Sequence, residues 1–530
     1  MSKTLFTVIG YVVFSLYTCG IMYLGDLIER KTGADKTVCR KMTHIVSAFV
    51  WVICYYFFGC SIHWVLLNGI GAAILGVVTY TGLMKGFERD DAGKSYGLFY
   101  FGLSTFVVAL VTYIVGERLY LYTGIAYYCL ALGDGFAPIT AKIFGKHNVQ
   151  IMKGKSLVGS LTVFVVSFLA TFVFGKIFDM KLSLLFVASV AALTCVTEFY
   201  GVKGLDNIFI EFAVFGYLVM YEFGLVSVTM QVVVLLTPFL AMAAIGSKSL
   251  SVSGGVSALV LFVVTAAFDN GSFAVVYMAT LFGVATAISL VTGKLYKKSR
   301  NVYKNSLQNG VENAQTEAQN EQNDDVSFDE NFPCECCDQL VAKAADVVKP
   351  MRNAKHVLAV GLIAVCFLVA YRFTQISLFI YLYALTLAEQ FADSVASDVG
   401  RLTKGKNYNI LGFKQIAKGL SGGVSLLGTL CALVASFALP LVAVAYGVLD
   451  WVAYGFVGGL SFVGTIVDSV LGAAVQSLYV CNNCGEQTEV PVHCGISARL
   501  TKGIAVVDNT AVNFITSAIT SLLGLLLLLL

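Results

Sequence analysis

Apolar runs close to the length that crosses a lipid bilayer recur along this chain. A transmembrane helix needs about 20 apolar residues. Such runs lie near residues 5–24, 44–62, 64–82, 96–114, 119–133, 157–175, 181–199, 207–222, 226–245, 254–270, 272–294, 355–372, 375–392, 420–447, 450–478 and 506–530. Because only helices and closed barrels satisfy their backbone groups in lipid, the pattern predicts an all-α, polytopic integral membrane protein with about sixteen transmembrane helices.

The composition supports this fold class. Hydrophobic residues make up 58% of the chain and charged residues 13%, whereas a soluble globular protein has about 25% charged residues. The formal net charge of +3 is too small to suggest a nucleic-acid partner. The first apolar run lacks a basic amino-terminal region and a small-residue cleavage site, so we interpret it as a retained span.

Basic residues cluster in five polar loops, at 26–43, 85–94, 142–155, 295–304 and 401–418. With the spans given above, all five loops fall on one side of the membrane, which the positive-inside rule identifies as the cytoplasm. The membrane would be a bacterial plasma membrane or an organelle membrane. Residues 300–350 differ in kind, because 305–331 are rich in Asn, Gln, Glu and Asp. They are predicted to be a flexible cytoplasmic insert.

The stretch from Gly133 to Ser160 combines a carboxylate, Asp134, with glycines and lysines. We expect it to be a polar loop at the membrane surface. Glycine lets the backbone approach a phosphate, lysine neutralises the phosphate, and a carboxylate holds Mg²⁺ together with phosphate oxygens. An ordinary basic loop would also explain the lysines. The candidate nucleotide-binding residues are Gly135, Gly145, Lys146, Lys153, Lys155, Ser156 and Gly159.

Other polar residues flank the spans on the same predicted side. His44 follows two basic residues, Glu198 ends one span, and Asp206-Asn207 begin the next. Carboxylates at such positions are costly unless they are paired or bind a metal. These residues can therefore converge on the stretch around Asp134.

These motifs resemble the phytol kinase and dolichol kinase family. The resemblance covers residues 1–225 and is carried by Arg40-Lys41-x-x-His44, Gly133-Asp134-x-x-Ala137, Phe144-Gly-Lys-His147, Lys155-Ser-x-x-Gly-Ser160 and Gly204-x-Asp-Asn207. It implies an integral-membrane enzyme that phosphorylates a polyisoprenoid alcohol, often with CTP. Val158 departs from the acidic residue usual in the family, and Ala141-Lys142 replace Gly-Arg.

The second half of the chain repeats the order of these motifs. An Asp-x-x-Ala motif, a basic glycine-rich loop, a buried carboxylate and an Asp-Asn pair occur again, which predicts two duplicated helical units. Coincidence among Gly, Ser and Asp-rich loops is the alternative. The overlay places Asp393 on Asp134, Ala396 on Ala137, Lys418 and Gly422 on Lys155 and Gly159, Asp468 on Glu198, and Asp508-Asn509 on Asp206-Asn207.

Residues 226–530 resemble the phytyl-phosphate kinase family. The matching motifs are Asp393-Ser-x-Ala-Ser-Asp398-x-Gly400, Gly419-x-Ser421-Gly422-Gly423-Val-Ser425, Gly464-x-x-x-Asp468-Ser-x-x-Gly472 and Asp508-Asn509-x-x-x-Asn513. This resemblance implies a second domain that acts on an isoprenyl phosphate, with the polar insert inside it.

Together the resemblances imply a bifunctional salvage kinase. The first domain would convert an alcohol of the phytol, geranylgeraniol or farnesol class to its monophosphate, and the second would make the diphosphate. Either Glu198 or His44 would accept the alcohol proton. Asp134, Asp393 and Asp468 complete the predicted catalytic residues, with Arg401 as an extra cation for the second step. Lys418, Gly419, Ser421, Gly422 and Gly423 would bind nucleotide phosphates, and the Mg²⁺ candidates are Asp134, Asp206, Asn207, Asp393, Asp398, Asp468, Asp508 and Asn509.

Four soft ligands lie close together near the carboxyl terminus. Cys481, Cys484, His493 and Cys494 have spacings that suit tetrahedral Zn²⁺. A hairpin with reduced, unliganded thiols is the alternative. The shorter group Cys334-x-Cys336-Cys337 in the polar insert is a weaker metal candidate.

Three other functions are consistent with the pattern. A CTP-dependent cytidylyltransferase acting on a lipid phosphate uses a similar loop, but it releases pyrophosphate rather than a nucleoside diphosphate. A lipid transporter could also contain duplicated membrane units. One half could instead be an inactive lipid-binding scaffold. The sequence leaves open the isoprenoid chain length, the choice of CTP or ATP, and the oligomeric state.

Overall fold

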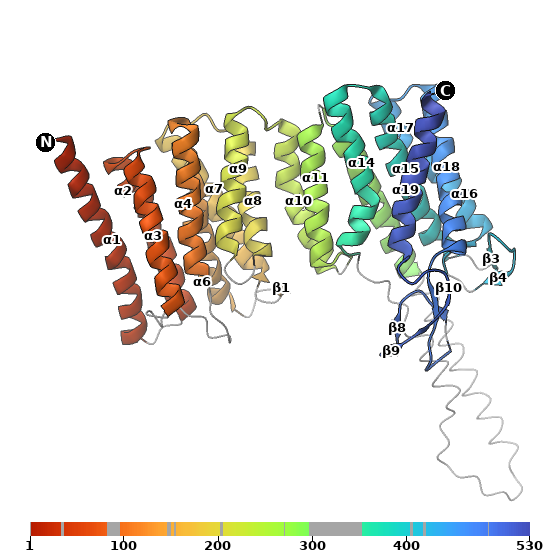
Figure 1. Ribbon diagram of the computed structural model, residues 1–530, viewed down its shortest axis with the longest axis horizontal. Helices are drawn as coiled ribbons and strands as arrows, with labels where there is room; N and C mark the ends of the chain where they lie inside the picture. Colours follow the sequence, from red (N-terminus) through yellow and green to blue (C-terminus); the bar gives the residue numbers. More distant parts are fainter. Residues whose placement is uncertain are drawn as a thin grey trace, which may run out of the picture. The chain divides into compact units, whose positions relative to one another are not determined.

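The computed structural model describes residues 2–32, 36–81, 96–145, 150–152, 155–201, 205–247, 249–269, 271–295, 352–402, 406–416, 420–485 and 487–529. The described chain is predominantly α-helical and forms two compact units, Met1–Ala267 and Phe268–Leu530 (Figure 1). The predicted polar insert lies outside the described residues, as do Cys334, Cys336, Cys337, Lys146, Lys153, Lys418 and Gly419.

The fold is that of a polytopic membrane protein, but the predicted number of spans is not confirmed. Within the described residues, 10 helices are long and apolar enough to cross a membrane, and three further apolar helices are shorter. The difference arises partly because a helix such as Ser377–Gly400 carries Glu389, Asp393 and Asp398 in its carboxyl-terminal half. Length and composition alone do not identify such a helix as a span.

Unit 1 is built from consecutive helices with a small hairpin between two of them. Ser156 and Ser183 begin two of these helices by accepting a hydrogen bond from the backbone N–H three residues later, as N-cap residues do. The helices are α1 (Lys3–Thr32), α2 (Lys36–Phe57), α3 (Ile62–Thr81), α4 (Gly97–Val115), α5 (Tyr120–Tyr128), α6 (Gly135–Ile143), α7 (Leu157–Ile177), α8 (Leu184–Tyr200), α9 (Asp206–Glu222), α10 (Val228–Gly246) and α11 (Val252–Phe268), with the strands β1 (Gln150–Met152) and β2 (Lys155–Ser156).

The Asp134 segment is helical rather than a loop. The π-helix η3 (Cys129–Asp134) joins α5 to α6 without interruption, so the predicted loop begins only after α6. Gly133, Gly135 and Pro138 suggested a turn, but helical packing overrides this local preference. Pro138 lacks an N–H and therefore cannot bond to the Asp134 carbonyl four residues earlier. This missing hydrogen bond fits the π-helical turn that ends at Asp134. Such π-bulges are frequent at functional sites.

Unit 2 has a long central helix. The helix α15 (Ser377–Gly400) packs against α14, α16, α18 and α19, and it runs through Asp393, so this motif is also helical. The other helices are Phe273–Leu295, α14 (Ala354–Thr374), α16 (Leu426–Ala438), α17 (Pro440–Ala445), α18 (Trp451–Ala474) and α19 (Asn509–Leu529).

The strands of unit 2 form two small sheets and a hairpin. They lie beyond one end of the unit 2 helices in Figure 1. One sheet has the order β4–β3–β5 and follows α15, and the other has the order β10–β6–β7 and lies between α18 and α19. The strands are β3 (Asn407–Asn409), β4 (Gln415–Ile416), β5 (Gly423–Val424), β6 (Leu478–Val480), β7 (Gln487–Thr488), β8 (Val492–His493), β9 (Ile496–Ser497) and β10 (Arg499–Lys502).

The same packing pattern occurs in both units. In unit 1, η3 and α6 pack against α7, and η3 also contacts α8 and α9. In unit 2, α15 packs against α16, α18 and α19 in the same order. The helices α4 and α14 precede the central helix and contact α9 and α19, respectively. This agreement supports the predicted duplication of a helical unit.

Candidate functional site

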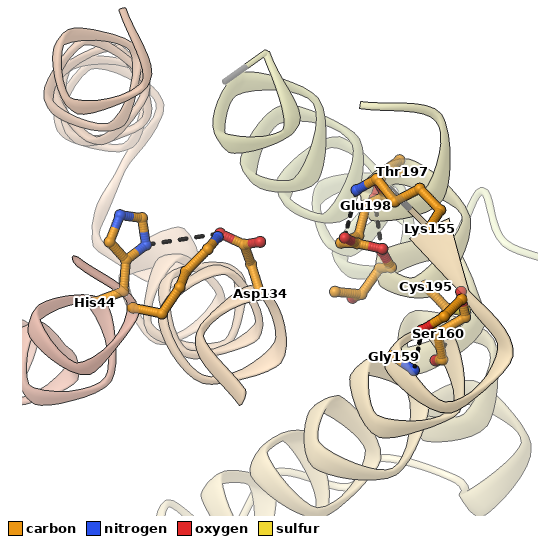
Figure 2. Close-up of polar contacts among 11 residues, drawn as sticks. His44, Asp134, Lys155, Gly159, Ser160, Cys195, Thr197 and Glu198 are labelled. Atoms are coloured by element: carbon orange, nitrogen blue, oxygen red, sulfur yellow. Dashed lines mark hydrogen bonds and ion pairs between the residues drawn. The ribbon is translucent and has the colours of Figure 1, made fainter. Parts of the chain in front are cut away.

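Asp134 is buried in unit 1 and has two partners from α2, a lysine and a histidine. The Lys41 ammonium forms an ion pair and a hydrogen bond with Asp134 Oδ2. The His44 ring approaches the same oxygen at 3.7 Å from Nδ1 (Figure 2). All three side chains are less than a tenth exposed. A buried carboxylate is costly unless it is paired, so Lys41 accounts for the stability of Asp134 in this position.

Lys155 and Glu198 form a second ion pair. Lys155 lies on β2 and reaches the carboxyl-terminal end of α8, where it donates to both a side-chain oxygen and the main-chain carbonyl of Glu198. Figure 2 shows Lys155 extended across the end of this helix. A lysine at a helix carboxyl terminus also interacts favourably with the helix dipole. The pair therefore fixes the short hairpin onto the helices.

The two ion pairs belong to one electrostatic cluster. Lys155 interacts with Asp134 and Asp206 as well as with Glu198. Burial opposes the charged form of Lys155, but the surrounding carboxylates outweigh it and raise the pKa of this lysine. Lys155 therefore stays protonated at neutral pH, and the cluster offers fixed positive charge next to buried carboxylates.

The amino terminus of α7 is capped by a serine and packs against α6. Ser156 Oγ accepts a hydrogen bond of 3.2 Å from the Gly159 N–H. A Cβ atom on Gly159 would lie 3.2 Å from Ser156 Oγ and 3.6 Å from the Ala137 carbonyl oxygen. The start of α7 therefore packs on the first turn of α6 with room for a Cβ atom beside the Ala137 carbonyl.

The equivalent cluster in unit 2 is acidic. Glu389 is fully buried, and its Oε2 atom accepts hydrogen bonds of 3.0 Å from Ser517 and of 3.0 Å from Gln390. Asp468 Oδ2 accepts a 3.1 Å hydrogen bond from Thr516. Asp393 acts electrostatically on both Glu389 and Asp468, and Glu389 also acts on Asp468. Among the described residues, neutral hydroxyl and amide groups rather than lysine contact Glu389 and Asp468.

Several buried oxygens near this acidic cluster have no hydrogen-bond partner in the part of the chain that the structure describes. They are Glu389 Oε1, Gln390 Oε1, Asn513 Oδ1 and Thr520 Oγ1. Gln390 and Asn513 contact each other through the Gln390 amide and the Asn513 carbonyl at 3.2 Å. Buried polar atoms normally have partners, and oxygen atoms are the ligands that Mg²⁺ prefers. The residues of unit 2 therefore fit a divalent cation.

The glycine loop of unit 2, residues 420–425 before α16, does not align with unit 1 as the sequence overlay predicted. Ser425, not a residue near Lys418, caps α16, and its Oγ accepts a 3.2 Å hydrogen bond from the Gly428 N–H. A Cβ on Gly428 would lie 3.3 Å from the Ala396 carbonyl oxygen. The structure thus pairs Ser425 and Gly428 with Ser156 and Gly159, which corrects the overlay of Gly422 on Gly159. The loop between β3 and α16 is longer in unit 2, so counting from the lysine gave the wrong register.

Gly422 and Gly472 lie where this loop packs against α18. Gly422 has a φ of +77°, and the space beside it is filled by the Ala473 backbone. A Cβ atom added to Gly472 would lie 3.1 Å from the backbone nitrogen of Gly422. Both glycines therefore permit contact between this loop and the carboxyl-terminal end of α18. Ser421 precedes them, and its N–H donates a 2.7 Å hydrogen bond to Glu489.

Two predicted metal residues, Asp508 and Asn207, each make a structural hydrogen bond, and Asn207 Oδ1 has no partner among the described residues. Asp508 is exposed and caps α19 through a 2.9 Å hydrogen bond from the Ala511 N–H. It lies eight residues before Thr516, which is about 12 Å along a helix. Asn207 is buried, and its amide donates to the Gly97 carbonyl at 2.7 Å.

The remaining predicted residues lie near the ends of helices. Asp206 begins α9, Asp398 is buried in the last turn of α15, and Arg401 follows that helix. Asn509 is the exposed first residue of α19, Gly423 lies in β5, and Gly145 follows α6 with a φ of +28°. Gly135 begins α6 and packs against Ile45 of α2.

The four predicted soft ligands do come together. Their ligand atoms, in Cys481, Cys484, His493 and Cys494, all lie within 4.8 Å of one another. They belong to the segment between α18 and α19.

Sequence reasoning missed several residues of these clusters. Lys41 was given only as part of a basic motif, and Glu389 was given no role. Glu211 was not considered, although it is buried in α9 and accepts a 2.6 Å hydrogen bond from Ser104. The signal for Glu211 and Glu389 was a carboxylate within an otherwise apolar run, which is rare in membrane helices and usually functional.

These features define the chain as an integral membrane protein with buried polar clusters in two similar helical units. Residues 235–521 match the family model described as integral membrane protein DUF92, so the chain belongs to this family. The matched region begins in unit 1 and continues through most of unit 2.

Curated relatives match shorter regions. An uncharacterized membrane protein of Methanocaldococcus jannaschii is 29% identical over 27% of this chain and 58% of its own length. Protein PGR of Arabidopsis thaliana is 28% identical over 25% of this chain and 48% of its own length. The chloroplastic farnesol kinase of the same plant is 29% identical over 26% and 47%. The chain spans about half the length of these relatives. No solved structure matches the chain.

Proposed function

We propose that this chain is a membrane-embedded kinase of isoprenoid alcohols and their monophosphates. Unit 1 phosphorylates an alcohol of the phytol, geranylgeraniol or farnesol class, and unit 2 phosphorylates the product to the diphosphate. The donor is a nucleoside triphosphate, with CTP preferred over ATP, and the reactions serve isoprenoid salvage at the cytoplasmic face of the membrane. The observation that carries the proposal is the buried Lys41–Asp134–His44 cluster beside Lys155 and Glu198. Similarity to a farnesol kinase supports the substrate class.

The unit 1 cluster has the parts that the first phosphorylation needs. Phosphoryl transfer depends on positioning and on neutralising charge, with little covalent chemistry from the protein. Lys41 and Lys155 each carry a positive charge. Their ammonium groups can exchange their carboxylate partners for nucleotide phosphates. His44 accepts the alcohol proton, because the Glu198 carboxylate is already engaged by Lys155. Asp134 holds the His44 ring from its Nδ1 side.

The unit 2 cluster suits the second phosphorylation. A lipid monophosphate attacks with an oxygen that is already anionic, so this step needs no comparable base. Glu389, Asp393 and Asp468 would hold Mg²⁺, and the unpartnered oxygens of Gln390 and Asn513 support this fit. Bound Mg²⁺ would neutralise the charge of the phosphates. Arg401, at the end of α15, adds a cation for the lipid phosphate.

A product assay on the full chain in detergent tests the proposal. Wild-type protein with Mg²⁺, CTP or ATP, and labelled geranylgeraniol should form the diphosphate. Asp134→Ala should form no product from the alcohol but should still phosphorylate supplied geranylgeranyl monophosphate. Asp393→Ala should accumulate the monophosphate. Glu117→Ala removes an exposed carboxylate of η2 (Glu117–Leu119) and should behave as wild type.

Two outcomes would replace the proposal. Release of pyrophosphate with a cytidylylated lipid would identify a cytidylyltransferase. Failure of the wild-type protein to phosphorylate phytol, geranylgeraniol or farnesol would refute the kinase function, and labelled-lipid uptake into vesicles without nucleotide would then indicate a transporter.

A further inference from the structure

The segment between α18 and α19 is a small ribbon with almost no hydrophobic core of its own. It comprises β6 to β10, from Leu478 to Lys502. Its strands are two to four residues long, and Val492 and Ile496 are exposed. Folded segments of this size usually require a disulfide or a metal. The ribbon therefore needs a source of stability other than apolar burial.

Three thiols and one imidazole gather inside this ribbon. Cys484 Sγ lies 3.5 Å from His493 Nδ1 and 3.8 Å from Cys494 Sγ, and Cys494 Sγ lies 3.3 Å from His493 Nδ1. In a tetrahedral zinc site, bond lengths of about 2.3 Å to sulfur and about 2.0–2.1 Å to nitrogen separate two sulfurs by about 3.8 Å and a sulfur and a nitrogen by about 3.6 Å. The three separations in the ribbon are close to these values.

The backbone around the cysteines also suits a metal ligand set. The N–H groups of Asn483 and Cys484 donate to the Cys481 sulfur, which is buried. Cys494 has a φ of +53°, a conformation that costs a non-glycine residue about 1–2 kcal/mol. Thiols are weak hydrogen-bonding groups, so their contacts with one another do not explain why the chain accepts this conformation.

We propose that Cys481, Cys484, His493 and Cys494 bind a structural Zn²⁺ ion that folds the ribbon. Four protein ligands complete a closed tetrahedral site, which is typical of structural rather than catalytic zinc. The ribbon bears Glu489, which accepts the 2.7 Å hydrogen bond from the Ser421 N–H in the glycine loop. Zinc therefore also holds Glu489 against that loop. This assignment does not depend on the kinase function.

Metal analysis of the full chain tests the site. Protein purified in detergent under reducing conditions should contain about one zinc ion per chain, as expected for a single closed site. Cys484→Ser should lose most of this zinc. Cys431→Ser changes a half-buried cysteine of α16 and should retain it. His493→Cys should also retain zinc, because it preserves four ligands, so zinc loss caused by misfolding can be distinguished from loss of a ligand.

A second measurement tests the link to the glycine loop. Chelation of zinc should speed amide hydrogen exchange of residues 420–424 and 487–497 in the wild-type chain, and added Zn²⁺ should reverse this change. In Glu489→Gln, the exchange of the ribbon should still respond to chelation, but that of residues 420–424 should respond less. Absence of zinc from wild type, equal zinc in Cys484→Ser, or a disulfide between these cysteines would overturn the proposal.

Discussion

The two units place a carboxylate at equivalent positions in similar helices but surround it with different charges. Asp134 in unit 1 is paired with Lys41 and approached by His44. Asp393 in unit 2 lies in an acidic cluster with Glu389 and Asp468. A buried ion pair is neutral as a whole, whereas neighbouring carboxylates repel one another unless a proton or cation intervenes. One helical scaffold thus supports two electrostatic environments.

A second difference lies at the start of the helix that follows. Ser156 and Ser425 cap α7 and α16 in the same way. The residue before the cap is Lys155 in unit 1 and Val424 in unit 2. Unit 1 therefore has a built-in cation at a position where unit 2 has an apolar side chain.

The largest expected contrast is in stability after removal of one charge. Lys41→Met leaves Asp134 buried without its main partner, which should cost about 3–5 kcal/mol of unfolding free energy. Asp468→Asn removes repulsion among carboxylates, so in Mg²⁺-free buffer it should leave stability unchanged or raise it. Thermal unfolding in detergent measures both changes.

The double variant Lys41→Met with Asp134→Asn serves as the control for this contrast. It removes both charges and should regain much of the stability lost in Lys41→Met, because no uncompensated carboxylate remains. If Lys41→Met were as stable as wild type, or if Asp468→Asn were as destabilising as Lys41→Met, the proposed difference between the units would be wrong.

Mg²⁺ should stabilise the protein through unit 2. Binding to the folded state at about 100 times the dissociation constant adds about 2.7 kcal/mol. The increase in melting temperature with Mg²⁺ should disappear in Glu389→Gln and in Asp468→Asn. It should persist in Asp134→Asn. An unchanged Mg²⁺ response in Glu389→Gln and Asp468→Asn would show that the cation binds elsewhere.

Most of the helical architecture could be predicted from the sequence. Apolar runs in a chain with few charges specify membrane helices, because lipid leaves the backbone no other partners. The number of spans could not be predicted in the same way. The helix α15 combines an apolar amino-terminal half with Glu389, Asp393 and Asp398, and only tertiary packing shows that both halves form one helix.

The candidate site was predictable by residue type but not by partner. Asp134, Lys155 and Glu198 carried a clear signal, because charges next to apolar runs require compensation. The Lys41–Asp134 pair joins residues 93 positions apart, so local sequence cannot identify it. The overlay of Gly422 on Gly159 missed the structural equivalents Ser425 and Gly428, because the loop before α16 is longer than the loop before α7.

Lys155 should matter more than its counterpart in unit 2. Lys155→Met removes a charged hydrogen-bond donor to Glu198, and a loss of about 1.5–3 kcal/mol is typical of such bonds. We expect phosphorylation of the alcohol to slow roughly tenfold to a hundredfold. The matched change Val424→Met should leave phosphorylation of the monophosphate nearly unchanged. Equal losses in both steps would argue against a separate role for each unit.

The smallest expected effects test whether the two units are structurally equivalent. Ser156→Ala and Ser425→Ala each remove one helix cap, which should cost about 1 kcal/mol in both cases. Ser156→Asp and Ser425→Asp keep a side chain that can cap and should restore most of this stability. Thermal unfolding of the four variants measures the effect, and unequal losses in the two alanine variants would indicate that only one serine anchors its helix.

Glycine substitutions sharpen this last test. A Cβ at Gly159 would lie 3.6 Å from the Ala137 carbonyl oxygen, and a Cβ at Gly428 would lie 3.3 Å from the Ala396 carbonyl oxygen. Gly428→Ala should therefore destabilise the protein more than Gly159→Ala, although both sites lie in the first turn of a capped helix. A larger effect at Gly159 would mean that the two helix contacts are not equivalent, and the argument for duplication would then depend on helix order alone.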